Sequence, residues 1–214
     1  MGAGARGGVT AVDVISDFVC PWCYIGKRHL DALRAEVSIE TRWHPYFLNP
    51  DVPSGGMDRA EMILAKFGSV ERARELGRAV EHAAREAGLH LDLGVAKRVP
   101  NTTDAHRLMR WAGGQGLADA LAERLFAAHF VDGRDIGAPD TLAGLAAEVG
   151  LDRALVAELL AGDADREAVQ AQADHVRAIG VTGVPTMVFG RQVAVVGAQP
   201  AAKLLRVLAQ LPAV

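Results

Sequence analysis

The chain has 214 residues, half of them apolar, and a formal net charge of −3 at pH 7 with no block of basic residues. This balance gives no support to a surface for nucleic acid or anionic membrane, and the length suits one compact domain with an insertion. No apolar run is long enough to span a bilayer, and the first eight residues lack the apolar centre of a signal peptide. We therefore expect a cytoplasmic protein whose substrate is a protein or a small molecule.

The first strong pattern is an apolar run followed by a pair of cysteines. Residues 9–15 are rich in β-branched side chains and predict a buried strand, and apolar residues recur at helical spacing from Trp22 to Val37. Cys20 and Cys23, the only cysteines of the chain, fall at the junction of the two elements. The sequence thus predicts a Cys-Pro-Trp-Cys dithiol at the amino end of a helix.

A dithiol in this position has a chemical use. Unpaired N–H groups and the positive end of the helix dipole favour a thiolate, so we expect a moderately lowered pKa for Cys20, the nucleophile. Cys23, about one turn further into the helix, is expected to be shielded and to resolve a mixed disulfide formed at Cys20. Pro21 suits the first helical turn, because it lacks an N–H that would be unpaired there. Trp22 offers an apolar surface to a substrate chain or packs against neighbouring helices.

Other interpretations of the two cysteines have less support. A structural zinc site needs four ligands, and His29 and His44 lack the spacing that would complete a set, so we expect no metal. A purely structural disulfide gains little across so short a loop, and in a reducing compartment a disulfide is more often transient. Two buried, unreactive cysteines are the remaining alternative.

Three polar residues near the dithiol in the sequence are predicted to have structural roles. Asp17 would oppose thiolate formation if it were close to Cys20, and we expect it to cap the turn before the helix. Lys27 and Arg28 are expected on a solvated face of that helix.

The chain changes character after the first helix. Residues 38–44 alternate as in a strand, and a Pro-, Gly- and Asn-rich stretch ends it at residue 56. From residue 58 to about 179, apolar residues recur with helical spacing between turn signals. The predicted helices are 58–66, 70–87, 103–112, 117–131, 140–149, 153–160 and 166–179. Asp140 and Asp163 follow the pattern of helix caps.

The carboxyl end returns to strands. Residues 185–189 and 192–196 predict two strands joined by a hairpin turn at Gly190 and Arg191, and an amphipathic helix follows over 200–211. The order of elements predicts an α/β fold in which a helical domain, residues 58–179, interrupts a smaller unit formed by 9–57 and 180–214.

Five motifs resemble the DsbA-like branch of the thioredoxin superfamily, specifically the FrnE-like oxidoreductases grouped with the 2-hydroxychromene-2-carboxylate isomerases. The resemblance covers nearly the whole chain and implies a thioredoxin-like fold, a central β-sheet flanked by helices, with an inserted all-helical domain and the dithiol in the groove between them. The motifs are Asp17-Phe18-Val19-Cys20-Pro21-Trp22-Cys23-Tyr24-Ile25-Gly26, Phe47-Leu48-Asn49-Pro50, Asn101-Thr102-Thr103-Asp104-Ala105-His106-Arg107-Leu108, Gly180-Val181-Thr182-Gly183-Val184-Pro185-Thr186 and Gly197-Ala198-Gln199.

The resemblance also assigns residues to the groove. It implies that Pro185 is cis and lies beside Cys20, leaving the N–H and C=O of Val184 free to pair with substrate; on the residues alone, a trans proline that opens a strand is the alternative. Asn49, Asn101 and His106 are expected to line the groove and bind substrate. A polar turn explains Asn101 almost as well, and a core histidine explains His106.

These observations predict a dithiol-disulfide oxidoreductase. It needs no metal or organic cofactor, and glutathione or another low-molecular-weight thiol is its possible co-substrate. Its partners are protein or small-molecule thiols and disulfides, and the sequence leaves open whether the helices also form a homodimer face.

Two further functions stay open. One is a glutathione-dependent isomerase or kappa-class transferase of small aromatic compounds, although such relatives usually have serine at the place of Cys20 and a Gly-Asn-Asp or Gly-Ser-Asp string at the place of Gly197-Ala198-Gln199. The other is a redox-responsive binding module whose helical domain changes partner affinity when the two cysteines join.

Overall fold

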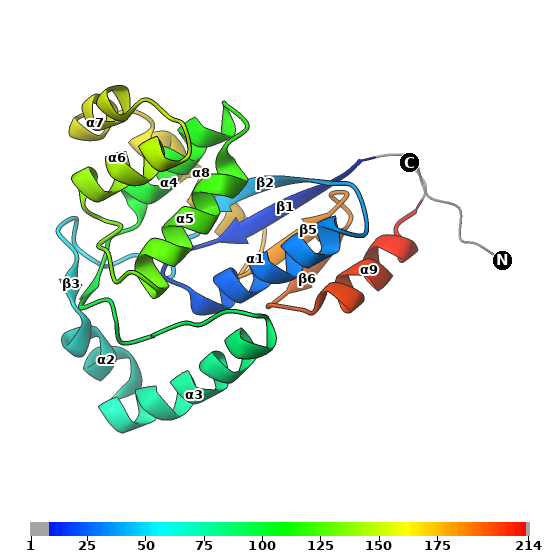
Figure 1. The fold of residues 1–214 in the computed structure, drawn as a ribbon, viewed down its shortest axis with the longest axis horizontal. Helices are drawn as coiled ribbons and strands as arrows, with labels where there is room; N and C mark the ends of the chain where they lie inside the picture. The colour runs from blue at the N-terminus through cyan, green and yellow to red at the C-terminus, as the bar shows by residue number, and fades with distance from the viewer. Residues whose placement is uncertain (1–8, 213–214) are drawn as a thin grey trace.

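A central sheet organises the computed structural model, which describes residues 9–212 (Figure 1). Its four strands lie in the order β2-β1-β5-β6, with β1 parallel to β2 and antiparallel to β5, and β5 antiparallel to β6. The strands are β1 (Thr10–Ser16), β2 (Ile39–Pro45), β5 (Thr186–Phe189) and β6 (Val193–Val196). This is the α/β, thioredoxin-like class that the sequence predicted.

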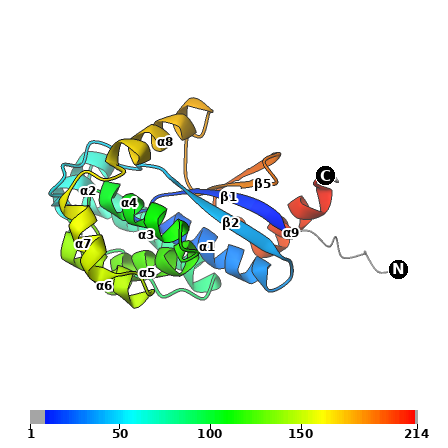
Figure 2. The same cartoon turned by 90° about the horizontal axis from the view of Figure 1, so that it is seen from above.

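Helices cover both faces of the sheet. Helices α1 (Pro21–Arg34) and α9 (Ala201–Gln210) lie on one face and α8 (Arg166–Ala178) on the other (Figure 2). Val14 of β1 packs in the cluster that includes α1 and α9 residues, and Ile15 packs with Val176 of α8. Because successive strand side chains point to opposite faces and both faces are covered, β1 needs apolar residues on both, which explains why most of its residues are apolar.

The segment between β2 and β5 is mostly helical, as predicted. Helices α2 and α3 form a pair beside the start of α1 (Figure 1). Helices α4 to α7 form a second group, on the other side of the start of α1 (Figure 1). No helix within residues 9–212 is long and apolar enough to cross a membrane. The bounds are α2 (Arg59–Phe67), α3 (Val70–Glu86), α4 (Thr103–Gly113), α5 (Ala118–Phe130), α6 (Pro139–Glu148) and α7 (Arg153–Ala161).

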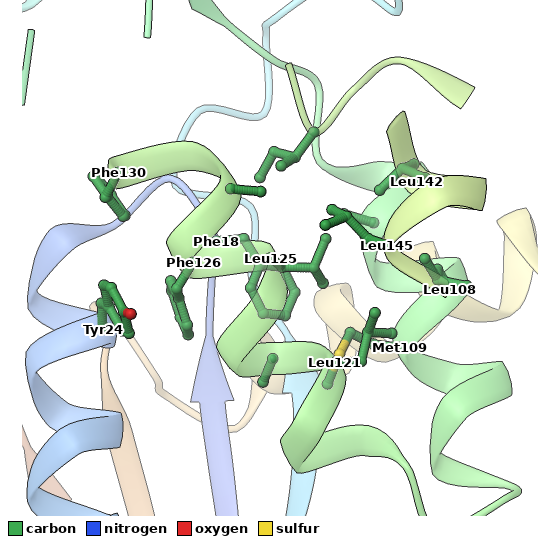
Figure 3. Packing of buried hydrophobic residues seen from close by; sticks show 14 of the residues in the cluster. Phe18, Tyr24, Leu108, Met109, Leu121, Leu125, Phe126, Phe130, Leu142 and Leu145 are labelled. Atoms are coloured by element: carbon green, nitrogen blue, oxygen red, sulfur yellow. The ribbon is translucent and has the colours of Figure 1, made fainter. Parts of the chain in front are cut away.

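One aromatic cluster joins the start of α1 to these helices. Phe18, which follows β1, lies with its ring centroid 5.0 Å from that of Phe126 on α5, and Tyr24 of α1 stacks on the same ring at 5.1 Å (Figure 3). Both cysteines belong to this core. The junction between β1 and α1 is therefore held from both sides by close packing.

Two predicted helix caps are wrong. Helix α6 is capped by Ala138 and begins at Pro139, whose fixed φ and missing N–H suit a first turn, so Asp140 lies inside the helix. Helix α8 is capped by Asp165, which has a left-handed φ of 58°. Asp163 instead accepts a hydrogen bond from Arg166 Nε at 3.0 Å.

Two short features complete the fold. A pair of two-residue strands, β3 (Met57–Asp58) and β4 (Arg98–Val99), was not predicted because two residues show no periodicity. The predicted hairpin between β5 and β6 is confirmed, since Gly190 and Arg191 have φ values of 56° and 59°, which a two-residue turn of this hand requires.

Candidate active site

The two cysteines lie at the amino end of α1, as predicted. Cys20 is the N-cap residue with an extended backbone, and Pro21 occupies the first helical position. The amide of Cys20 donates to the Asp17 carbonyl at 3.1 Å, and the amide of Cys23 donates to the Cys20 carbonyl at 3.0 Å. Both thiols are free and buried, whereas the Trp22 side chain is 38% exposed. The exposed indole leaves an apolar surface beside Cys20.

The surroundings shift the pKa values of the two thiols in opposite directions. The Cys23 thiol lowers the pKa of Cys20 by hydrogen bonding, and the backbone N–H groups of Cys23 and Trp22 add to this, against burial and the Asp17 charge. Burial, the hydrogen bond to Cys20 and the Cys20 charge raise the pKa of Cys23 well above its ordinary value, although Ser16 and the Asp17 backbone favour its thiolate. Cys20 therefore ionises first. The helix end was expected to contribute most to the lowered pKa of Cys20, but the Cys23 thiol contributes more.

The Val184–Pro185 peptide bond is cis and lies at the dithiol, as the resemblance implies. The Cys20 thiol donates to the Val184 carbonyl at an Sγ–O distance of 3.7 Å. Gly26 makes this close packing possible, because a Cβ there would lie 3.1 Å from both Pro185 Cγ and Met187 Cε. Gly26 was part of a recognised motif, but its role could be found only from the structure.

A buried polar group lies beneath the dithiol. Asp17 is 1% exposed, and its Oδ2 accepts from the Leu48 amide at 2.7 Å, so its side chain does not cap the turn, contrary to the prediction. Its Oδ1 lies 3.6 Å from Nε2 of His106. These two atoms have no hydrogen-bond partner within residues 9–212. Unpaired polar atoms next to a buried thiol are candidates for proton transfer.

Asp17→Asn is expected to lower the pKa of Cys20 further. The substitution removes the negative charge that raises this pKa, and it keeps an oxygen that can accept from the Leu48 amide. Thiolate absorbance measured against pH should show the thiolate forming at lower pH than in the wild type. Asp163→Asn, which removes a charge from a 91% exposed side chain, is the control. A Cys20 pKa that is equal to or above the wild-type value would contradict this electrostatic account.

A cavity of about 980 Å³ opens beside the dithiol, between α2, α3 and the start of α1. Five residues predicted for the groove line it, namely Cys20, Pro21, Trp22, Asn49 and Val184. Arg59 and His129 also line it, and no sequence pattern indicated either of them.

Two residues predicted to bind substrate lie elsewhere. The Asn101 side chain donates to the Val52 carbonyl at 2.7 Å and accepts from the Thr103 amide at 3.0 Å, so it holds the chain in front of α4. His106 lines a separate, polar cavity of about 610 Å³ and packs edge-on against Phe47. Direct substrate binding by Asn101 or His106 stays a prediction.

The expected solvated face of α1 is partly buried. Lys27 is 6% exposed and pairs with Asp31 and Glu123, both at 2.8 Å, and Arg28 pairs with Glu123 at 2.9 Å. These contacts join α1 to α5, so the prediction for Lys27 is wrong. The sequence could not show that α5 would supply a carboxylate there.

Possible metal ligands are scattered in the part of the chain described here. No group of three or more His, Cys, Asp or Glu residues within 9–212 is arranged to hold a metal ion.

Comparisons with known proteins agree with this geometry. The uncharacterized protein YwbO of Bacillus subtilis is 26% identical over 183 residues, covering 84% of this chain and 86% of that protein. A probable DsbA oxidoreductase from Streptomyces coelicolor is 28% identical with a TM-score of 0.84, covering 96% of this chain and 92% of that one.

Two more distant structures share the fold. A 2-hydroxychromene-2-carboxylate isomerase is 19% identical with a TM-score of 0.72, covering 94% and 95% of the two chains. The cytosolic disulfide reductase DsbM from Pseudomonas aeruginosa is 21% identical with a TM-score of 0.68, covering 94% and 100%. The model of the DSBA-like thioredoxin domain matches residues 11–209, and the chain therefore belongs to the DSBA-like thioredoxin domain family.

Proposed function

We propose that this protein is a thiol-disulfide oxidoreductase in which Cys20 is the nucleophile and Cys23 the resolving thiol. The observation that carries the proposal is the placement of two free thiols at the start of α1, with Cys20 as the N-cap residue and its Sγ 3.7 Å from the Val184 carbonyl that precedes the cis Pro185. The lowered pKa favours the thiolate at Cys20 over that at Cys23, and burial, which raises the pKa of Cys23, favours its protonated form.

The exchange conserves atoms and electrons. The Cys20 thiolate attacks one sulfur of a substrate disulfide, a mixed disulfide forms, and the other substrate sulfur leaves as a thiolate. Cys23 loses its proton and attacks Cys20, which releases the second substrate thiolate and forms the Cys20–Cys23 disulfide. Two electrons pass from the protein to the substrate, and the reverse sequence oxidises a substrate dithiol.

The proton of Cys23 needs an acceptor in a buried place. We assign this part to the Asp17 carboxylate, because its Oδ1 has no hydrogen-bond partner within residues 9–212 and its backbone contacts the Cys23 thiol. His106 lies against this carboxylate and also lines the polar cavity, so it offers a route for the proton towards solvent.

The Val184 carbonyl and Pro185 position the partner in this proposal. Val184 lines the cavity and faces the Cys20 sulfur, where an extended substrate segment can pair with its backbone. We also propose a low-molecular-weight thiol as co-substrate, which is supported by a structural neighbour, DsbM, that has been solved with GSH. We propose that the protein needs no bound cofactor, because the dithiol alone accounts for the chemistry. We also propose a cytoplasmic location.

Trapping of the mixed disulfide tests the proposal. Reduced Cys23→Ser protein, mixed with bis(2-hydroxyethyl) disulfide, should gain one hydroxyethylthio group on Cys20, because no resolving thiol remains. The wild-type protein should instead lose two hydrogen atoms, gain no adduct and contain the Cys20–Cys23 disulfide. Mass spectrometry of the intact protein and its peptides distinguishes the products. A stable adduct on wild-type Cys20 would overturn the role of Cys23.

A further inference from the structure

The cavity at Cys20 has the dimensions of a small-molecule site. Its volume of about 980 Å³ lies near the upper end of the roughly 300–1,000 Å³ typical of ligand pockets. Much of its wall is apolar and comes from α2, α3, the segment before β4 and the end of α5. The apolar wall includes Met62, Ile63, Phe67, Val70, Leu93 and Phe130. Such walls stabilise an apolar chain that is removed from water.

The charged residues of the cavity wall are predominantly basic. The wall contains four cationic side chains, Arg59, Lys66, Arg74 and Arg78, and two acidic ones, Glu81 and Asp92. The excess of positive charge in the wall therefore attracts an anionic ligand into the cavity.

Of these four cations, Arg59 is the one that is not exposed. It is partly buried, burial lowers its pKa, and its guanidinium has no ion pair or hydrogen bond to any residue between 9 and 212. The charge of Asp92 acts on it, but Asp92 Oδ1 accepts from the Gly94 amide at 2.7 Å instead. A partly desolvated cation without a partner is costly unless an anion joins it.

His129 gives a second, independent indication of an anion. It lines the same cavity and is 5% exposed, and its Nδ1 has no hydrogen-bond partner in the described part of the chain. Burial and the charge of Arg59 lower the pKa of His129 to about 4, against weaker effects of Asp17 and Asp135. At neutral pH the ring is therefore uncharged and keeps one N–H, which can donate to an anionic oxygen.

We propose that this cavity binds a thiol or disulfide carried on an apolar chain that ends in a carboxylate. Arg59 and His129 hold the carboxylate, the apolar wall covers the chain, and the sulfur reaches Cys20. The redox step rests on the proposed function. Lipoate represents the class: its cyclic disulfide accepts two electrons and two protons from Cys20 and Cys23, which become a disulfide while lipoate becomes dihydrolipoate.

The test compares lipoate with lipoamide, which has the same ring and chain but no charge. Reduced protein is mixed with an excess of either compound, and formation of the Cys20–Cys23 disulfide is followed in a single turnover. The wild type should react about tenfold faster with lipoate, the effect expected of one charge-assisted pair. In Arg59→Gln the ratio of the two rates should fall to about one, and in Arg59→Lys most of the preference should remain. Arg72→Gln, which removes a cation of α3 that does not line the cavity, should keep the wild-type ratio.

Calorimetry with octanoate separates this inference from the redox proposal. Octanoate carries no sulfur, so its binding does not depend on the dithiol, and Arg59→Gln should weaken that binding about tenfold. If octanoate binds in this way but no disulfide exchanges with Cys20, the proposed function fails and the binding site stands. A wild-type protein that does not bind octanoate, or an Arg59→Gln variant that keeps the preference for lipoate, would overturn the inference.

Discussion

Cys20→Ser is expected to reduce exchange with a small disulfide by about 10³-fold or more. A serine hydroxyl is not ionised at neutral pH and cannot form a disulfide. The remaining thiol, Cys23, is 2% exposed and its pKa is raised, so it cannot replace the nucleophile. The rate at which reduced protein consumes bis(2-hydroxyethyl) disulfide in a single turnover measures the effect.

Cys23→Ser is the matched control for this prediction. It keeps Cys20 and replaces the Cys23 thiol with a hydroxyl that can also donate to the Cys20 sulfur, so its first step should slow by less than about tenfold. A Cys20→Ser protein that retains more than a tenth of the wild-type rate would show that Cys20 is not the attacking group.

Arg107→Met is expected to destabilise the fold by about 3–5 kcal/mol. Arg107 is fully buried on α4, and its guanidinium donates to the carbonyls of Ala164, Leu159 and Gly162 and to the Asp104 carboxylate. The donor–acceptor distances are 2.6 to 2.8 Å. Methionine fills a similar volume but leaves three backbone carbonyls and a carboxylate without this donor. The free energy of unfolding in urea is the measurement.

Arg110→Met provides the comparison on the same helix. Arg110 is half exposed and makes an ion pair with Asp165 at 3.0 Å, so its loss should cost about 1 kcal/mol or less. Equal losses of stability in the two variants would contradict the structural role assigned to Arg107.

The parts of the site that the sequence predicted correctly depend on local patterns. The dithiol at a strand-to-helix junction follows from an apolar run, a Cys-Pro-Trp-Cys string and helical spacing, all within about thirty residues. The cis bond before Pro185 was implied by resemblance, and the residues alone gave no physical reason for it. The helices between β2 and β5 were predictable because repeated apolar spacing and glycine turns mark their lengths.

The parts that the sequence could not predict depend on contacts between distant segments. Lys27 was assigned to solvent because nothing near it in the chain indicates Glu123 of α5. Asp17 was predicted to cap the turn before α1, but its carboxylate accepts a hydrogen bond from the amide of Leu48, which follows β2. Arg59 and His129 line one cavity although they lie on α2 and α5, which are far apart in the sequence. Such long-range pairings leave no periodic signal in a single sequence.

Titration of the dithiol against buffers of stepped redox potential tests the central claim most directly. Free thiols are alkylated at each potential and counted by mass. A midpoint near about −270 mV would mark a reductant, and one between about −200 and −120 mV an oxidant or isomerase. The account predicts one two-electron transition in which Cys20 and Cys23 become oxidised together within a single chain. A protein that forms no intramolecular disulfide at any potential would contradict it.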